Sequence, residues 1–344
     1  MNALVLTDYM KLEYMDVPVP TLSEEDVLIQ IKVASVCGSD IHGINGKSLR
    51  RNPPIIMGHE ASGVIVKIGK NVKAFHIGDR VTFNSSLYCN ECSFCKEGKN
   101  NLCESGMVVG VSTDTFHKDG AFAEYLAVPQ HVLYALPPTV AFLEAALIEP
   151  IAVAMHAISL LPIKTNDTVV LFDTGTIATF AVQLLKLKSL SKLIVVGRNK
   201  ERLELALELG ADVIINSQEM NVKNQVFALT NGKGADCTCD MAGVQSTFTD
   251  GLSCLKKGGT FSTIANLTPK FTIDMINLIM REITLKGSCV SNGEYLDIIP
   301  LLEQNKIRTD YIISATIPLS EGGDFIMRLH NNEIPNFGKL ILIP

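Results

Sequence analysis

The sequence predicts an α/β protein with two domains, one mostly β and one built on a doubly wound parallel sheet. Between about residues 25 and 135, short apolar runs are separated by Gly, Asn, Asp and Pro, which is typical of strands joined by irregular loops. From about residue 165 the order becomes strand, helix, strand, which is typical of a parallel sheet with helices on both faces. The chain has 344 residues, 47% of them hydrophobic, so it can form a core in each domain.

The elements follow from these apolar runs. In the first region, strands are expected at 27–36, 61–69, 79–83 and 122–128. In the second, strands at 168–173, 192–197, 211–216, 235–243 and 259–265 alternate with helices such as 178–189 and 200–210. The tail has a helical stretch at 295–306 and a strand at 338–344.

One apolar segment, residues 145–163, is long enough to raise the question of a membrane span. It contains Glu149, Pro150 and His156, and ionisable groups at the centre of a bilayer are costly. We therefore expect a buried helix and no membrane partner. The net charge of −6 provides no broad positive field, which argues against a nucleic acid partner.

Four cysteines with the spacing Cys89-x2-Cys92-x2-Cys95-x7-Cys103 can form a tetrahedral shell around one zinc ion. Four thiolates leave no open position, so such a site stabilises the fold and performs no chemistry. The alternative is a disulfide cluster, which would suit a short secreted chain. The odd total of nine cysteines and a start without a signal-peptide pattern favour zinc and a cytoplasmic location. Cys237 and Cys239 are expected to be buried strand thiols.

The order of several motifs resembles the zinc-containing medium-chain alcohol and polyol dehydrogenases. They are Cys37-Gly38-Ser39-Asp40-Ile41-His42, Gly58-His59-Glu60-x2-Gly63-x5-Gly69, the four-cysteine segment, Glu149-Pro150 and the later βαβ region. The resemblance spans nearly the whole chain and is closest to the sorbitol and polyol dehydrogenase branch. It implies a GroES-like catalytic domain over residues 1–150 and 286–344, and a Rossmann domain over residues 151–285.

The same resemblance implies a second, catalytic zinc. The family's ligands match Cys37 and His59, with Glu60 as a further ligand and Glu149 either binding the metal or orienting a zinc-bound water. Such an open site polarises the oxygen of an alcohol or ketone substrate while hydride moves to or from a nicotinamide. Ser39 and His42 match the family's proton relay, although His42 can equally be an ordinary loop histidine.

The expected dinucleotide loop departs from the family pattern Gly-x-Gly-x-x-Gly. The chain reads Asp173-Thr174-Gly175-Thr176-Ile177-Ala178, so only the middle glycine, which allows the backbone to approach a pyrophosphate, is kept. Gly175, Thr176 and Ile177 are the expected cofactor contacts. Asp173 either caps the following helix through its side chain or repels the phosphates.

The end of the next strand bears on the choice of cofactor. Relatives that use NAD place an acidic residue there for the ribose hydroxyls, whereas this chain has Gly197-Arg198, with Arg202 one turn later. A 2′-phosphate would meet positive charge, so NADP(H) is preferred and NAD(H) remains possible. The alternative is that both arginines are simply solvated at the start of a helix.

The substrate is less defined. Lys286-Gly287-Ser288-Cys289-Val290-Ser291 departs from the Arg-Tyr pair of sorbitol dehydrogenases, and Lys47, Arg50 and Arg51 either contact an anionic substrate or form an exposed basic loop. We predict a zinc-dependent oxidoreductase acting on a polyol, a sugar-alcohol derivative or a secondary alcohol or ketone, in a homodimer or homotetramer. The alternatives are a catalytically silent, zinc-stabilised nucleotide-binding protein and an NAD-dependent amino-acid-alcohol dehydrogenase of the same family.

Overall fold

A computed structural model describes residues 1–264, 268–335 and 338–344, which fall into two units. The first comprises Met1–Glu149 and Asn292–Pro344, and the second comprises Pro150–Ser291. Residue 286, the boundary expected from the sequence, lies in β18 (Thr284–Gly287), which pairs with β17 (Leu255–Thr263) in the sheet of the second unit. In the described part of the chain, no helix is long and apolar enough to cross a membrane.

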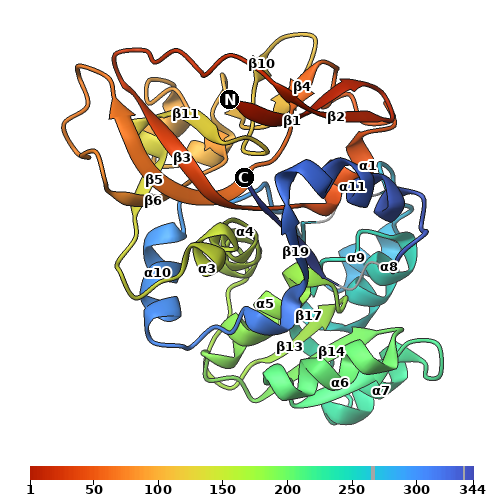
Figure 1. Cartoon of the computed structure of the whole chain (residues 1–344). Coiled ribbons are helices and arrows are strands. Elements are labelled where there is room, and N and C mark those ends of the chain that lie inside the picture. The colour runs from red at the N-terminus through yellow and green to blue at the C-terminus, as the bar shows by residue number, and fades with distance from the viewer. Residues whose placement is uncertain (265–267, 336–337) are drawn as a thin grey trace. The chain divides into compact units, whose positions relative to one another are not determined.

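The first unit is mostly β (Figure 1). Its main sheet has seven strands in the order β12-β6-β5-β3-β20-β19, with β11 also paired to β3. The strands of this sheet are β3 (Asp26–Ser35), β5 (Glu60–Ile68), β6 (Arg80–Phe83), β11 (Tyr125–Pro129), β12 (Leu133–Ala135), β19 (Ile313–Pro318) and β20 (Lys339–Ile343). The smaller sheets consist of β1 (Asn2–Asp8) with β2 (Lys11–Asp16) and β4 (Ile55–Ile56), β7 (Ser86–Leu87) with β8 (Met107–Val108), and β9 (Val111–Ser112) with β10 (His117–Lys118).

The position of β20 matters most for the site. This strand comes from the end of the chain, yet it lies in the main sheet between β3 and β19, antiparallel to β3 and parallel to β19. Its register places Leu342 opposite Ala34 and Ile341 opposite Ser35. Because of this pairing, Lys339 at the start of β20 reaches residues that precede it by almost the whole length of the chain.

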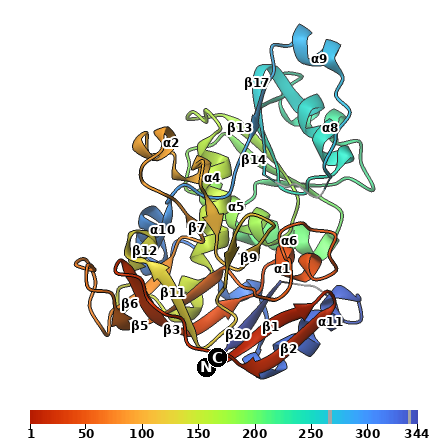
Figure 2. The ribbon, with the colours of Figure 1, turned by 90° about the horizontal axis from the view of Figure 1, so that it is seen from above.

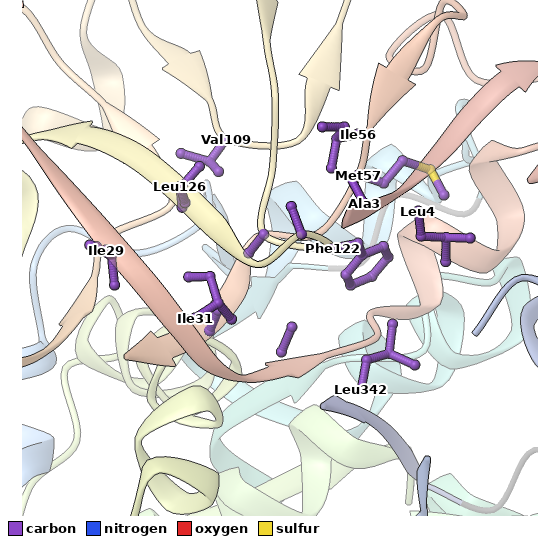
Figure 3. Packing of buried hydrophobic residues seen from close by; sticks show 14 of the residues in the cluster. Ala3, Leu4, Ile29, Ile31, Ile56, Met57, Val109, Phe122, Leu126 and Leu342 are labelled. Atoms are coloured by element: carbon purple, nitrogen blue, oxygen red, sulfur yellow. The ribbon is translucent and has the colours of Figure 1, made fainter. Parts of the chain in front are cut away.

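The core of the first unit lies between its sheets (Figure 3). Phe122 is fully buried and belongs to one cluster with Leu4, Ile31 and Leu342. These residues come from both ends and the middle of the unit, so burying their side chains joins the terminal segments to the main sheet. Each such side chain contributes about 1.5–3 kcal/mol to the stability of the fold.

The helices of the first unit are short. They are α1 (Gly38–Gly43), α2 (Ser93–Lys96), α3 (Phe142–Ala146), α10 (Tyr295–Glu303) and α11 (Gly322–His330), together with the 3-10 turns η1 (Asn100–Leu102), η2 (Gln130–Val132), η3 (Asp310–Ile312) and η4 (Leu319–Glu321). Helix α10 and strand β20 confirm the helix and strand predicted in the tail. The sequence pattern did not predict β1, β2, α1 or α11.

The second unit is a six-stranded parallel sheet in the order β15-β14-β13-β16-β17-β18. Its other strands are β13 (Thr168–Phe172), β14 (Lys192–Gly197), β15 (Val213–Asn216) and β16 (Ala235–Asp240), and its helices are α5 (Thr176–Lys186), α6 (Lys200–Leu209), α7 (Val222–Leu229), α8 (Gln245–Cys254) and α9 (Met275–Met280). From β13 the chain adds β14 and β15 on one side of the sheet and then β16, β17 and β18 on the other, as expected for a doubly wound sheet. Figure 2 shows α8 and α9 beside β17, where Phe248, Phe261 and Leu278 pack together.

Most elements expected in this region are confirmed. Cys237 and Cys239 are buried thiols in β16, as predicted. The segment 145–163 contains the end of α3 and the whole of α4 (Ile148–Ser159), and most of its apolar residues are buried. Residues 259–263 of the strand expected over 259–265 fall in β17, residue 264 follows this strand, and residue 265 lies outside the described residues.

Candidate functional site

The four-cysteine segment forms a closed cluster. The sulfur atoms of Cys89, Cys92, Cys95 and Cys103 all lie within 4.8 Å of one another, and all four residues are half-buried. Helix α2 and the turn η1 fold the intervening residues so that the two ends of the segment meet, with Cys103 Sγ 3.5 Å from Cys89 Sγ. Four thiols at this separation suit a tetrahedral zinc site without an open position.

Backbone amides favour the ionised form of Cys89 and Cys92, whereas burial and the neighbouring thiols raise the pKa of Cys95 to about 12. The N–H groups of Glu91 and Cys92 donate to Cys89 Sγ at 3.4 and 3.3 Å. Backbone N–H groups, foremost that of Cys95, lower the pKa of Cys92 to about 6. Since the thiolate is the metal-binding form, the local fold prepares the segment to bind zinc.

The second cluster comprises Cys37, His59 and Glu60, whose ligand atoms also lie within 4.8 Å of one another. Cys37 follows β3 as the N-cap residue of α1, whereas His59 and Glu60 are at the start of β5. Gly58, just before them, has φ of +92°, and a Cβ there would lie 2.4 Å from the Phe122 ring. Glycine at this position therefore lets the chain turn against the core and present His59 beside Cys37.

Asp40 organises this second cluster. Its carboxylate is fully buried and accepts a 2.9 Å hydrogen bond from Arg51 and a 3.2 Å hydrogen bond from the backbone N–H of Cys37. One carboxylate oxygen also lies 3.6 Å from His59 Nδ1. Asp40 therefore holds the backbone of Cys37 through a hydrogen bond and places its negative charge beside His59.

The charges around His59 favour a cation. Burial by itself would lower the pKa of His59, but the negative charge of Asp40, with further contributions from Cys37 and Glu149, raises it to about 10. His59 Nδ1 is buried and has no hydrogen-bond partner among the described residues. A sulfur, an imidazole and a carboxylate in a negative field fit a zinc ion, so the residues present suit the metal implied by the sequence.

The two acidic residues expected at this site have different partners. Both carboxylate oxygens of Glu60 lie 2.5 Å from Lys339 Nζ, and this ion pair is buried. Glu149 does not join the group within 4.8 Å, and its Oε1 accepts a 3.0 Å hydrogen bond from Ser85 Oγ. Burial raises the pKa of Glu149, and the negative charge of Glu60 raises it further, against the effect of His59.

Tyr295, the first residue of α10, lies near the same carboxylates. Its side chain is fully buried and stacks on Tyr134 with ring centroids 4.6 Å apart. Burial, with the charge of Glu149, raises the pKa of Tyr295 well above its usual range, although the backbone N–H of Ser85 acts in the opposite direction. The Tyr295 hydroxyl forms no hydrogen bond of good geometry within the described residues.

Ser39 and His42, the expected proton relay, lie on α1. Both side chains are exposed, whereas Asp40 and Ile41 between them are buried. They are three positions apart on the helix, so they share its outer face. The alternative of an exposed basic loop is wrong for Arg51, because its side chain is buried and forms an ion pair with Asp40.

The expected dinucleotide loop joins β13 to α5, with Gly175 as the N-cap residue and Thr176 and Ile177 in the first turn. Asp173 has φ of +117°, in the left-handed region that glycine prefers and that other residues rarely adopt. Gly175, not Asp173, is the N-cap of α5, and no side chain caps this helix. The Asp173 carboxylate instead lies beside Gly175, where burial raises its pKa and the backbone N–H groups of Thr174 and Gly175 act in the opposite direction.

Gly197 has a packing role. A Cβ at this position would lie 2.7 Å from Thr174 Cγ2, so the close approach of the loop to β14 requires glycine. Arg198 is exposed directly after the strand. Asn199 caps α6 by accepting a 2.8 Å hydrogen bond from the backbone N–H of Arg202, which places Arg202 in the first turn of that helix.

Lys339 and Ser85 were not predicted from the sequence, and Asp40 was recognised only as part of the motif at residues 37–42, without a role of its own. Lys339 precedes an apolar run and has no local signal that distinguishes it from a surface lysine. Its role becomes visible only when β20 is placed in the sheet.

Two family models match the chain. The model for the alcohol dehydrogenase GroES-like domain matches residues 23–138, and the model for zinc-binding dehydrogenase matches residues 176–304. Together these matches cover most of the chain.

Curated relatives match nearly the full length. The chain is 30% identical to an L-threonine 3-dehydrogenase of Bacillus subtilis over 96% of this chain and 94% of the relative. It is 31% identical to a D-arabitol-phosphate dehydrogenase of Enterococcus avium over 95% and 93%. It is 32% identical to a sorbitol dehydrogenase of Halalkalibacterium halodurans over 93% and 94%.

Solved structures have the same fold. A zinc-binding dehydrogenase from Sinorhizobium meliloti bound to NADP is 28% identical, with a TM-score of 0.90 over 100% of this chain and 99% of that chain. An alcohol dehydrogenase from Escherichia coli in complex with NADH is also 28% identical, with a TM-score of 0.90 and the same coverage. These matches, with the two metal-ligand clusters, show that the chain belongs to the zinc-dependent medium-chain alcohol dehydrogenase family.

Proposed function

We propose that this protein is a zinc-dependent dehydrogenase that prefers NADP(H) and acts on a polyol, a sugar-alcohol derivative or a secondary alcohol or ketone. The observation that carries the proposal is the separation of two ligand clusters, one closed by four cysteines and one mixed. The four-cysteine cluster would suffice for stability, so the Cys37, His59 and Glu60 cluster calls for another role. Catalysis is the role that a mixed, open ligand set supports.

In this proposal Cys37, His59 and Glu60 hold a zinc ion, with Glu149 as the alternative or additional carboxylate. When bound, zinc supplies a Lewis acid for the substrate oxygen, and the nicotinamide supplies or accepts the hydride. Asp40 orients the His59 ring, and Lys339 holds the Glu60 carboxylate.

Ser39 and His42 are proposed to carry the proton between the substrate oxygen and solvent. Their exposure on one face of α1 supports this role, because a relay must reach water. A Ser39→Ala variant should lose turnover more strongly than a His42→Ala variant, since a hydroxyl can both accept and donate a proton. Equal activity of Ser39→Ala and the parent across pH 6–9 would contradict the relay.

The preference for NADP(H) rests on Arg198. Gly197 is required by the packing of Thr174, so the missing acidic residue is not independent evidence about the cofactor. The exposed guanidinium of Arg198, directly after β14, remains the supporting observation. Contacts of this kind contribute about 1.5–3 kcal/mol, or about ten- to a hundredfold in affinity.

The cofactor proposal is tested by measuring dissociation constants for NADPH and NADH. Arg198→Ala should lose affinity for NADPH and keep its affinity for NADH. Lys200→Ala is the matched control, because Lys200 is also an exposed cation at the start of α6. Tighter binding of NADH than of NADPH by the parent would show that the assignment is wrong.

The reaction itself is tested with a panel of polyols, sugar-alcohol phosphates, secondary alcohols and L-threonine. The relatives named for threonine and for arabitol phosphate make both substrate classes necessary members of the panel. Turnover that disappears in Cys37→Ser, while NADPH still binds, would support the proposed site. Cofactor binding without turnover of any substrate by the zinc-loaded parent would favour the catalytically silent alternative.

We also propose that the chain forms a homo-oligomer through α9 and β18. The side chains of Met275, Ile276, Ile279 and Met280 are 52%, 77%, 62% and 73% exposed, and β18 is the last strand of its sheet. An apolar stripe beside a sheet edge is unfavourable in water, and a second copy would bring the same stripe and edge. Sedimentation of the double variant Ile276→Ser and Ile279→Ser should show a smaller species than the parent, and an unchanged species would contradict this interface.

Because both ligand clusters need reduced thiols, we propose the cytoplasm as the compartment.

A further inference from the structure

The loop between β13 and α5 already holds an anion of its own. Asp173 has a left-handed backbone, and its carboxylate folds back over the loop, so that a Cβ added to Gly175 would lie 2.8 Å from Asp173 Oδ2. Burial disfavours the charged form of this carboxyl group, whereas the nearby backbone N–H groups of Thr174 and Gly175 favour it and hold its pKa down. Those groups directly precede the N-terminus of α5, an eleven-residue helix whose dipole favours negative charge at this end.

An incoming dinucleotide needs the same environment. Its pyrophosphate is expected at this helix N-terminus, and it brings negative charge to a place where the Asp173 carboxylate is half-buried. The first turn of α5 contains no acidic residue, so Asp173 is the acidic group of the loop itself. Two anions at the same helix N-terminus repel each other, and protonation of the carboxyl group removes that repulsion.

The charged groups that face Asp173 come from two neighbouring elements. Arg202 on α6 favours the carboxylate, whereas Asp240 at the end of β16 disfavours it. Asp240 is itself fully buried, and its Oδ2 has no hydrogen-bond partner in the described residues. Burial is the largest influence on Asp173, and it raises the pKa of this group above its ordinary value. The uncharged form is therefore more accessible here than for an aspartate in water.

We propose that Asp173 makes dinucleotide binding proton-linked, so that the loop takes up one proton from solvent as the cofactor phosphates arrive. The proton binds to the Asp173 carboxyl group, and no other bond forms or breaks. This inference rests on the proposed function, because it needs the loop to bind a dinucleotide. It differs from a simple repulsion in predicting a measurable proton uptake.

The sign of the pH dependence follows from this linkage. Bound cofactor disfavours the carboxylate, so the pKa of Asp173 is higher in the complex than in the free protein. Between these two values the complex holds more protons, and affinity falls as pH rises, by up to about tenfold per pH unit. Below both values Asp173 is protonated in both states, and above both it is ionised in both, so this dependence vanishes.

The test is calorimetric titration of the zinc-loaded, full-length protein with NADPH and with NADH. Titrations at several pH values, each in two buffers of different ionisation enthalpy, give both the dissociation constant and the number of protons taken up. The parent is compared with Asp173→Asn, which keeps the shape and tolerates the left-handed backbone, and with Asp173→Gly, which restores the usual residue. Asp250→Asn is the control, because Asp250 in the same unit has a pKa raised by burial alone.

We expect the parent and Asp250→Asn to take up a proton fraction that both Asp173 variants lack. The ratio of the parent's dissociation constant to that of Asp173→Asn should increase with pH. Comparison at equal pH cancels the titration of the cofactor's own 2′-phosphate, whose pKa is near 6. Equal proton uptake and a constant ratio in parent and Asp173→Asn would overturn the inference while leaving the proposed function intact. Absence of binding by all four proteins with either cofactor would overturn both.

Discussion

The two metal-ligand clusters are assembled in different ways. Cys89, Cys92, Cys95 and Cys103 lie within one short segment, and local turns and backbone amides bring their sulfurs together. The other cluster joins residues from two separate parts of the chain, and a lysine from its end completes the surrounding charges. A closed site therefore needs little more than ligand spacing, whereas an open site needs a tertiary structure that balances buried charge.

The largest difference should appear when each cluster loses a ligand. Because zinc binding provides the folding energy of a closed site, Cys92→Ser should unfold the segment 89–103 and lower the metal content from about two to about one per chain. Limited proteolysis and metal analysis would detect this loss. Cys289→Ser removes an exposed cysteine outside both clusters and should change neither measurement. An intact, protease-resistant segment in Cys92→Ser would contradict the structural role.

The next largest effect should come from the charge balance of the open cluster. Lys339→Met leaves the Glu60 carboxylate buried without its partner, which should destabilise the metal-free protein by about 3–5 kcal/mol. The double variant Lys339→Met and Glu60→Gln should recover most of this loss, because it removes both charges. Urea unfolding of the three proteins gives the free energies. Equal stability of the single and double variants would show that the ion pair does not carry the effect.

A smaller effect is expected at Asp40. Asp40→Asn keeps the shape but removes the charge facing His59 and Arg51, so metal affinity at the open cluster should fall by about ten- to a hundredfold. Metal affinity at the four-cysteine cluster should not change. Competition with a chelator, followed separately for the two metals, distinguishes these outcomes, and a parallel fall at both sites would indicate general unfolding instead.

The smallest effect is expected at Tyr295. Its hydroxyl has no hydrogen-bond partner of good geometry, so Tyr295→Phe should change the free energy of unfolding by less than about 1 kcal/mol. Tyr295→Ala removes the stacked ring as well and should cost about 3–5 kcal/mol. A loss in Tyr295→Phe as large as that in Tyr295→Ala would show that the hydroxyl is held by the protein.

Much of the fold could be predicted from the sequence because it depends on local patterns. The strand-helix alternation after residue 165 indicated the parallel sheet, and the apolar runs before residue 135 indicated β3, β5, β6 and β11. Strands β1 and β2 were missed, since four of the six residues of β2 are exposed and three are charged, so the strand lacks an apolar run. Helix α11 was missed in a segment that carries two glycines at its start.

The sequence by itself determined the ligands that are close along the chain, and the motifs that resemble the family pointed to the others. The spacing of four cysteines predicted a closed cluster because a short loop can bring them together only in a few ways. Tertiary structure alone decided which charges surround the open cluster. Lys339 and Glu60 are 279 residues apart, and Arg51 became a buried partner of Asp40 only through packing. Tertiary structure also decided the left-handed backbone of Asp173, because the conformation of a loop residue depends on the strand and the helix that the loop joins.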